Sequence, residues 1–337
     1  MKKKMLTAAA LAVFFAACKK SDAPLRPDAY EPVAAAAKPA TPQDAIHFTA
    51  PFVFPEGVVY DPFNDRFLVS SIAQGTIGAV TREGVYSPII QDAALASTAG
   101  MEIDKGGKRL LVANANVEGT LAQLAVYDLK SGSRIFLADL AAVANDGAPH
   151  LANDVAIDPQ GNAYVTDSYA GIIYKVTPSG KASILFQDAA FTPPPGGFGL
   201  NGIEYHKSGY LLVGHSYTNS ILKIQSDGSS YTKVQLETPI SVPDGLLLSK
   251  DGKQLLVVNN GAGYTTDKVL TFNSKDNWKT ATATGTFSTT DPVYLSTVTS
   301  DGKTGYALHS YIHLLMGGQA REVFTLQPLP FNDNHPF

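Results

Sequence analysis

One hairpin pattern recurs six times along the chain, and this repeat restricts the fold more than any other feature. Each copy has an apolar run, a short polar turn and a second apolar run, as in NDVAIDPQGNAYVTDS. Such a pattern is typical of a β-hairpin. The copies begin at Glu56, Ala99, Asn153, Asn201, Asp244 and Tyr294. Their spacing of 43 to 54 residues is the length of one β-propeller blade.

Two further strand-like runs follow each hairpin, for example GIIYKVTP and SILFQD after Ser168. Helical patterning is nowhere sustained. A β-sandwich also has many short strands, but it does not repeat one hairpin six times. The sequence therefore predicts an all-β, six-bladed β-propeller with four-stranded blades over residues 45–337. We expect the run DAIHFTAPFVF to pair with REVFTLQPL and close the last blade, which hides both strand edges.

The first 44 residues have a different composition. Residues 1–17 contain three lysines and an apolar segment too short to span a bilayer, the layout of a secretory signal. The segment FAAC resembles a bacterial lipobox, so we predict cleavage before Cys18 and lipidation of its thiol; a plain signal peptide is the alternative. Residues 18–44 are rich in Pro and Ala and predict a spacer. This interpretation places the protein in the bacterial cell envelope, with the lipid as its only membrane contact.

Charge and cysteine content exclude some classes of protein. The formal net charge of −4 becomes −7 when the three signal lysines are removed, which argues against nucleic acid as a partner. Cys18 is the single cysteine of the chain, so an intrachain disulfide is excluded. We expect a monomer that binds a small molecule.

Four of the repeats open on an oxygen-bearing side chain. In a propeller the first strand of each blade lines the central channel, so Glu56, Asn153, Asn201 and Asp244 are predicted to converge at one rim. Asn and Asp before a strand often only form turns, but Glu does not. Two carboxylates and two amides make an all-oxygen site of formal charge −2. Such a site suits Ca²⁺, could accept Mg²⁺ or Mn²⁺, and matches Zn²⁺ less well.

A second ring of polar residues follows the second strand of each hairpin. Its members are Ser71, Asn114, Asp167, His215, Asn259 and His309. Solvation explains Ser71, Asn114 and Asn259, whereas two histidines and an aspartate leave exposure and function equally open. We take Asp167 and His215 as candidate catalytic residues. Asn114 and His309 join Asn153 as candidate substrate contacts.

Several phrases resemble a known family. The stretches PEGVVYD, LANDVAIDPQGNAYVTDS, LNGIEYHKSGYLLV and PDGLLLSKDGK are similar to the senescence marker protein (regucalcin), gluconolactonase and luciferin-regenerating enzyme family. A narrower similarity to propellers of the calcium-dependent phosphotriesterase superfamily includes Asp276, Trp278 and Ala281. The resemblance implies a divalent metal held by Glu56, Asn201 and Asp244, with Asn153 beside it. One departure is Leu151, where sugar lactonases often have an arginine.

Three functions remain open on this basis. The first is a metal-dependent hydrolase of a lactone or other ester, in which the resemblance implies that Asp244 is also base or nucleophile, with Asp167 or His215 as second candidates. The second is a non-catalytic binding propeller with a structural calcium; a strictosidine-synthase-like condensation is a third. The loop FTPPPGGFGL, residues 191–200, either covers a less polar substrate or simply connects two blades.

Overall fold

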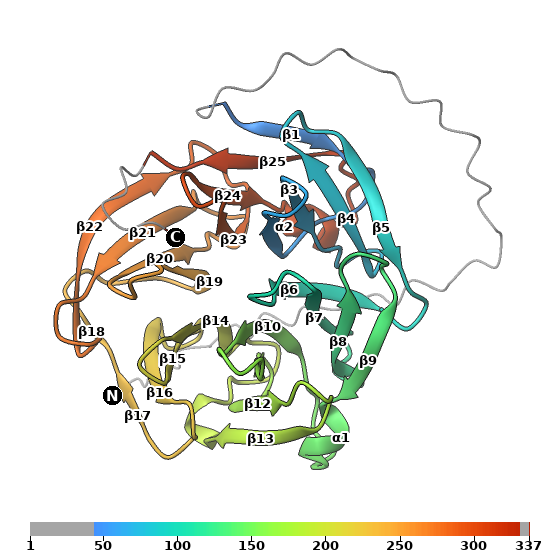
Figure 1. Ribbon diagram of the computed structural model, residues 1–337. Coiled ribbons are helices and arrows are strands. Elements are labelled where there is room, and N and C mark those ends of the chain that lie inside the picture. Colours follow the sequence, from blue (N-terminus) through green and yellow to red (C-terminus); the bar gives the residue numbers. More distant parts are fainter. Residues whose placement is uncertain (1–43, 331–336) are drawn as a thin grey trace, which may run out of the picture. The chain divides into compact units, whose positions relative to one another are not determined.

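The computed structural model describes residues 44–330 and 337, and over this range it confirms the predicted six-bladed β-propeller. Six sheets surround a central channel, with the first strand of each hairpin innermost (Figure 1). The predicted signal, the lipidation site Cys18 and all but the last residue of the spacer lie outside the described residues. No helix in the described part is long and apolar enough to cross a membrane.

Each blade is an antiparallel sheet whose strands follow one another in the chain, except in the last blade. Blade one contains β2 (Val58–Asp61), β3 (Arg66–Val69), β4 (Thr76–Thr81) and β5 (Tyr86–Gln91). Blade two contains β6 (Ser97–Ile103), β7 (Arg109–Ala115), β8 (Ala122–Asp128) and β9 (Arg134–Asp139). Blade three contains β10 (Ala152–Ile157), β11 (Ala163–Asp167), β12 (Ile172–Val176) and β13 (Ala182–Gln187).

The other three blades repeat this arrangement. Blade four contains β14 (Leu200–His206), β15 (Tyr210–His215), β16 (Ser220–Gln225) and β17 (Tyr231–Lys233). Blade five contains β19 (Pro243–Leu248), β20 (Gln254–Asn259), β21 (Lys268–Asn273) and β22 (Thr280–Ser288), and β18 (Gln235–Leu236) pairs in parallel with β22. Blade six contains β23 (Leu295–Ser300), β24 (Gly305–His309), β25 (Val323–Pro328) and β1 (Ile46–Thr49). Short helices α1 (Ala141–Ala144), η1 (Ala189–Phe191) and α2 (Ile312–Met316) lie in connections.

The two ends of the propeller domain close the ring, as the sequence predicts. Strand β1 pairs antiparallel with β25, with Phe48 opposite Phe324 in the register. Both side chains are buried, and the His47 ring hydrogen-bonds the Thr325 hydroxyl at 3.0 Å. Every blade therefore has four strands, and blade six takes its outermost strand from the opposite end of the domain.

The core lies between neighbouring blades. Every residue of β15 is buried, because both faces of this strand are covered. Tyr164 of blade three, for example, lies in one apolar cluster with Leu211 and Val213 of blade four. The second strand of each hairpin therefore reads as a nearly continuous apolar run rather than as an alternating one.

A β-bulge interrupts the start of five innermost strands at the same place. The register shifts fall between Thr98 and Met101, Ala152 and Val155, Leu200 and Ile203, Pro243 and Leu246, and Leu295 and Val298. The equivalent of Asn201 and Asp244 in blade six is therefore Ser296. The expectation that Tyr294 occupies this position is wrong by two residues.

Candidate functional site

The bulged positions form the site at the strand-start end of the channel, where the innermost strands begin. A bulge bends the strand and re-aims the side chain that it carries. Asn153, Asn201 and Asp244 all lie within such bulges, and Glu56 lies two residues before β2. The bulges thus present Asn153, Asn201 and Asp244, and the segment before β2 adds Glu56 as the fourth oxygen-bearing side chain.

Close packing of the innermost strands explains the glycine that follows three of these four residues. A Cβ on Gly57 would lie 2.3 Å from the Ala99 carbonyl oxygen, and one on Gly202 would lie 2.4 Å from the Asp244 carbonyl oxygen. Blade three has Asp154 in place of glycine. Its carboxylate accepts hydrogen bonds from the Val155 and Ile203 amides, at 2.8 and 3.0 Å. Asp154 therefore joins two neighbouring innermost strands.

Asp244 is held by amide side chains. The Asn260 amide donates to Asp244 Oδ2 at 2.7 Å, and both residues are buried. The Asn201 amide also donates to this carboxylate and bonds Ser216 Oγ at 3.1 Å. Asn153 is at the same register position, and its amide makes no hydrogen bond to the described part of the chain. The structure thus brings Asn201 and Asp244 together and leaves the Asn153 amide available to a ligand.

Glu56 is half-buried and Asp244 is buried, and their carboxyls repel each other. Burial raises the pKa of Glu56 well above its usual value, and the charges of Asp244 and Asp154 raise it further. Burial also raises the pKa of Asp244 to about 7, although the hydrogen bonds from Asn260 and Asn201 oppose that shift. Both carboxyls would be ionised more readily if a cation lay between them.

The second ring of predicted residues is bound to nearby loops rather than to this site. Asp167 accepts hydrogen bonds from the Leu151, Tyr169 and Ala170 amides and also contacts the His150 ring at 2.7 Å. The His215 ring contacts the Phe191 carbonyl oxygen at 2.9 Å. These bonds fix the connections around blades three and four. A catalytic role would require Asp167 or His215 to give up such contacts.

Asn114 and His309 differ from each other in their contacts. The Asn114 amide bonds backbone groups of residues 94, 96 and 97 and the Gln123 side chain, so it is fully engaged. His309 Nε2 is buried without a hydrogen-bond partner among the described residues. Burial, with the charges of His47 and Arg321, lowers the pKa of His309 to about 4. His309 is thus a neutral ring with a free nitrogen.

The side chains that contact the candidate metal ligands each lie one residue after a member of the predicted second ring. Ser216 bonds Asn201, Asn260 bonds Asp244, and the Ser310 and Ser296 hydroxyls bond each other. Side chains alternate between the two faces of a strand, so a shift of one residue changes which face is reached. The sequence repeat contained this signal, because Ser216, Asn260 and Ser310 each follow a member of the predicted ring.

Sequence reasoning also missed two aromatic residues near the carboxyls. Tyr294 feels the charges of Asp244 and Glu56, which, after burial, raise the pKa of its phenol. The His313 ring of α2 stacks on Tyr294 with a centroid separation of 6.2 Å, and its Nδ1 is buried without a hydrogen-bond partner in the described part of the chain. Both residues come from connections around blade six rather than from the repeated hairpin.

The loop that precedes Asn201 carries an exposed aromatic contact. Phe198 is 39% exposed and packs against Tyr169 with ring centroids 5.8 Å apart. Phe191, at the start of the same loop, is buried against Phe186. One end of the loop thus anchors in the core, and the other presents an apolar surface.

The carboxyl and amide oxygens at the strand-start end meet only part of the requirements of a hard cation. Two carboxyls and neighbouring amide oxygens are oxygen ligands of the kind that Ca²⁺ takes. Within residues 44–330, however, no group of three or more His, Cys, Asp or Glu side chains is arranged to hold a metal ion. A cation at this end would therefore depend on Glu56 and Asp244 together with neutral oxygens such as that of Asn201.

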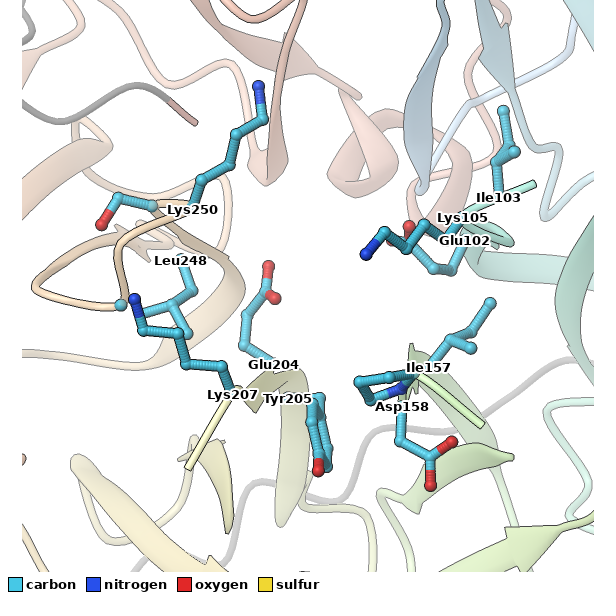
Figure 2. Close-up of a pocket in the computed structure, with 13 residues that line it drawn as sticks. Glu102, Ile103, Lys105, Ile157, Asp158, Glu204, Tyr205, Lys207, Leu248 and Lys250 are labelled. Atoms are coloured by element: carbon cyan, nitrogen blue, oxygen red, sulfur yellow. The ribbon is translucent and has the colours of Figure 1, made fainter. Parts of the chain in front are cut away.

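A cavity of about 300 Å³ lies at the other end of the innermost strands, where they turn into the second strands. Figure 2 shows charged side chains around its opening, among them Glu204, Lys105 and Lys207. None of the predicted site residues lines this cavity. We refer to this region as the turn end of the channel.

Solved structures share this fold at low sequence identity. The major allergen Mala s 1 of Malassezia sympodialis matches with a TM-score of 0.71 and 17% identity, covering 86% of this chain and 96% of the allergen. A luciferin-regenerating enzyme matches with a TM-score of 0.60 and 12% identity, covering 86% and 98%. A gluconolactonase of Xanthomonas campestris matches with a TM-score of 0.58 and 13% identity, covering 85% and 89%.

These likenesses establish the class of fold. The chain is a six-bladed β-propeller of the type found in gluconolactonases and in luciferin-regenerating enzyme. No protein-family model matches the sequence, and no curated protein matches it significantly. Since one fold carries many activities, function must be argued from the site.

Proposed function

We propose that the strand-start end of the channel hydrolyses a lactone or other ester with the help of a divalent cation. The observation that carries this proposal is the pair of neighbouring, mutually repelling carboxyls, Glu56 and Asp244, whose pKa values are both raised. Raised carboxyl pKa values are common where a group must take up or release a proton near neutral pH. The gluconolactonase and luciferin-regenerating enzyme among the structural neighbours support an enzyme of this kind.

A hard divalent cation fits the charge of this site better than any neutral occupant. Glu56, Asp244 and Asn201 would hold it, and Ca²⁺ is the first choice for oxygen ligands, with Mg²⁺ or Mn²⁺ possible. When bound, such an ion polarises the ester carbonyl and stabilises the charge that develops on its oxygen. It also removes the repulsion between the two carboxyls.

The proton transfers belong to Asp244. Asn260 fixes one oxygen of this carboxylate, so the other can face water in a defined direction. Asp244 takes a proton from the water whose oxygen attacks the carbonyl carbon. The carbon–oxygen bond of the ester then breaks, and Asp244 returns the proton to the leaving oxygen. Asn153, with its free amide, orients the substrate beside this group.

The walls of the site favour a less polar substrate over a polyhydroxylated sugar lactone. Leu151 offers no hydrogen bond from its side chain, whereas each unpaired hydroxyl of a buried polyol would cost about 1–3 kcal/mol. Phe198 and Tyr169 add an apolar surface before Asn201. The free ring nitrogen of His313, beside Tyr294, can bond a single polar group of the substrate.

A substrate panel tests the proposal. The purified protein is assayed with aliphatic and sugar lactones, aryl esters and phosphotriesters, first with saturating Ca²⁺ and then after EDTA. We expect one class to be hydrolysed, activity to vanish with EDTA and to return with Ca²⁺, and aliphatic lactones to be preferred over sugar lactones. A silent panel in which Ca²⁺ still raises the melting temperature contradicts the hydrolase.

The same silent result would support a binding propeller with a structural cation. In that case Asp244→Asn would lower Ca²⁺ affinity, and neither the wild type nor the variant would hydrolyse any compound of the panel.

A further inference from the structure

The cavity at the turn end of the channel is built by four successive blades. Its lining comes from the last residues of β6, β10, β14 and β19 and from the turns that follow them. Its volume of about 300 Å³ is at the lower limit of the range of about 300–1,000 Å³ that is typical of small-molecule sites. No sequence motif pointed to this end.

Strand register sorts the charges of this cavity into two levels. Glu102 and Glu204 each follow, by one residue, the first regular pair after the bulge, Met101–Val112 and Ile203–Val213. Lys105 and Lys207 lie three residues further, and Lys250 has the same place in blade five, four residues after Leu246. These lysines lie in the turns, beyond the ends of β6, β14 and β19. The glutamates are thus the deeper level, and the exposed lysines form the rim.

The two levels do not neutralise each other. Burial raises the pKa of Glu102 to about 8 and that of Glu204 well above its usual value, and the Glu102 charge adds to the latter shift. No ion pair joins either glutamate to a lysine within the described residues. In Figure 2 the Glu204 carboxylate and the Lys105 side chain point into the opening from opposite sides. Carboxyl and ammonium groups are therefore both available to a ligand, and a bound ammonium group would favour ionisation of the two carboxyls.

Apolar side chains fill the space between these two levels. Ile103, Ile157 and Leu248 line the cavity together with the Tyr205 ring, which stacks on Tyr164 with centroids 5.9 Å apart. Asp158 also lines the cavity, but its carboxylate is engaged by the Asn162 amide at 2.7 Å and the Tyr164 hydroxyl at 3.0 Å. The available charges are hence two carboxyls below, three ammonium groups above and an apolar wall between.

We propose that this cavity binds a small zwitterion whose amine and carboxylate are separated by a short apolar chain. The ammonium end lies between Glu102 and Glu204, the carboxylate end lies among Lys105, Lys207 and Lys250, and the chain packs on the apolar wall. A simple cation would leave the lysine rim unpaired, and a simple anion would leave the glutamates unpaired. The inference does not depend on hydrolysis at the strand-start end.

Calorimetric titration of the full-length protein with 6-aminohexanoate, hexylamine and hexanoate, all in EDTA, tests this proposal. We expect 6-aminohexanoate to bind about ten-fold or more tightly than either single-charge compound, since each charged hydrogen bond contributes about 1.5–3 kcal/mol. If hexanoate or hexylamine bound as tightly as 6-aminohexanoate, the cavity would be a simple anion or cation site, and the zwitterion proposal would be wrong. Absence of binding for all three would overturn the proposal.

Matched variants locate the ligand. Glu204→Gln and Lys207→Gln should each weaken 6-aminohexanoate binding about ten-fold, whereas the exposed controls Glu237→Gln and Lys130→Gln, outside the cavity, should not. Asp244→Asn should also leave the affinity unchanged. Loss of binding in Asp244→Asn but not in Glu204→Gln would move the ligand to the strand-start end and contradict the inference.

Discussion

The two ends of the channel use the same strands but surround their carboxyls with different neighbours. At the strand-start end, a bulge presents Asp244 and the segment before β2 presents Glu56, and the Asn260 amide holds the Asp244 carboxylate. At the turn end, Glu102 and Glu204 lie on regular strand below a rim of lysines. The first arrangement lacks a cationic neighbour and so favours a cation, whereas the second combines carboxyl groups with cationic lysines. Position along one strand therefore decides which ligand chemistry is possible.

The variant Asp244→Asn is expected to have the largest effect that distinguishes the two ends of the channel, a loss of turnover. The amide keeps an oxygen ligand but cannot accept the proton, so turnover at saturating Ca²⁺ should remain about 10²-fold or more below wild type. Steady-state kinetics of the best substrate in the panel, with Ca²⁺ varied, measures this.

Asn201→Ala is the control, because a neutral ligand without an acid–base role should lose Ca²⁺ affinity first. Full recovery of Asp244→Asn at high Ca²⁺ would move the base to Asp167 or His215. The calcium would then be only a structural brace at Asp244.

A smaller effect, on stability rather than on turnover, is expected from Gly57→Ala. The added Cβ would lie 2.3 Å from the Ala99 carbonyl oxygen, so two innermost strands must separate at the strand-start end. Overpacking of this kind costs about 1–3 kcal/mol of unfolding free energy. Urea denaturation checks the value. Gly106→Ala is the matched control, since its Cβ would meet nothing closer than 3.9 Å.

The smallest effect concerns pH. Without a cation, burial holds the pKa of Asp244 at about 7 and that of Glu56 well above its usual value. The unfolded chain releases these protons near pH 4, so the native state keeps protons that the unfolded state has lost. Stability from these groups is therefore lost as pH rises through about 7.

Melting temperatures in EDTA should accordingly fall by a few degrees between pH 5.5 and pH 8, since about 1 kcal/mol corresponds to roughly 2–4 °C in a domain of this size. Added Ca²⁺ should reduce this dependence of the melting temperature on pH. The remaining slope belongs to Glu102 and Glu204, and 6-aminohexanoate should reduce it. Glu56→Gln should resemble added Ca²⁺. A melting temperature that rises with pH in EDTA would show that these carboxyls are ionised in the metal-free protein.

The hairpin repeat was sufficient to predict all six blades and the pairing of β1 with β25, because apolar alternation and turn residues recur in each copy. It failed in blade six, where YLSTVTS has no glycine to mark the bulge, and the register was placed two residues early. It also selected His215 and His309 instead of the neighbours Ser216 and Ser310, since side chains alternate between the two faces of a strand and the pattern did not show which face meets the site.

Other residues at the two ends of the channel could not be recognised from the hairpin repeat. Tyr294 and His313 come from connections, whose path the pattern does not encode. Glu102, Glu204 and the three lysines occur near turns, where polar residues are expected simply for solvation. Only the common register of blades two, four and five shows that they line one cavity.

The closing pair β1–β25 also constrains the order of folding. His47 and Thr325 are 278 residues apart in sequence, and joining such distant segments carries a loop-closure entropy of about 5 kcal/mol. Blades one to five are assembled from contiguous segments, so each can form while the chain is still emerging. Blade six must wait for residues 323–328, and until then β24 has an open edge. Contact order therefore makes ring closure the slow, final event, and it is the step at which the nascent propeller is most exposed to strand-edge aggregation.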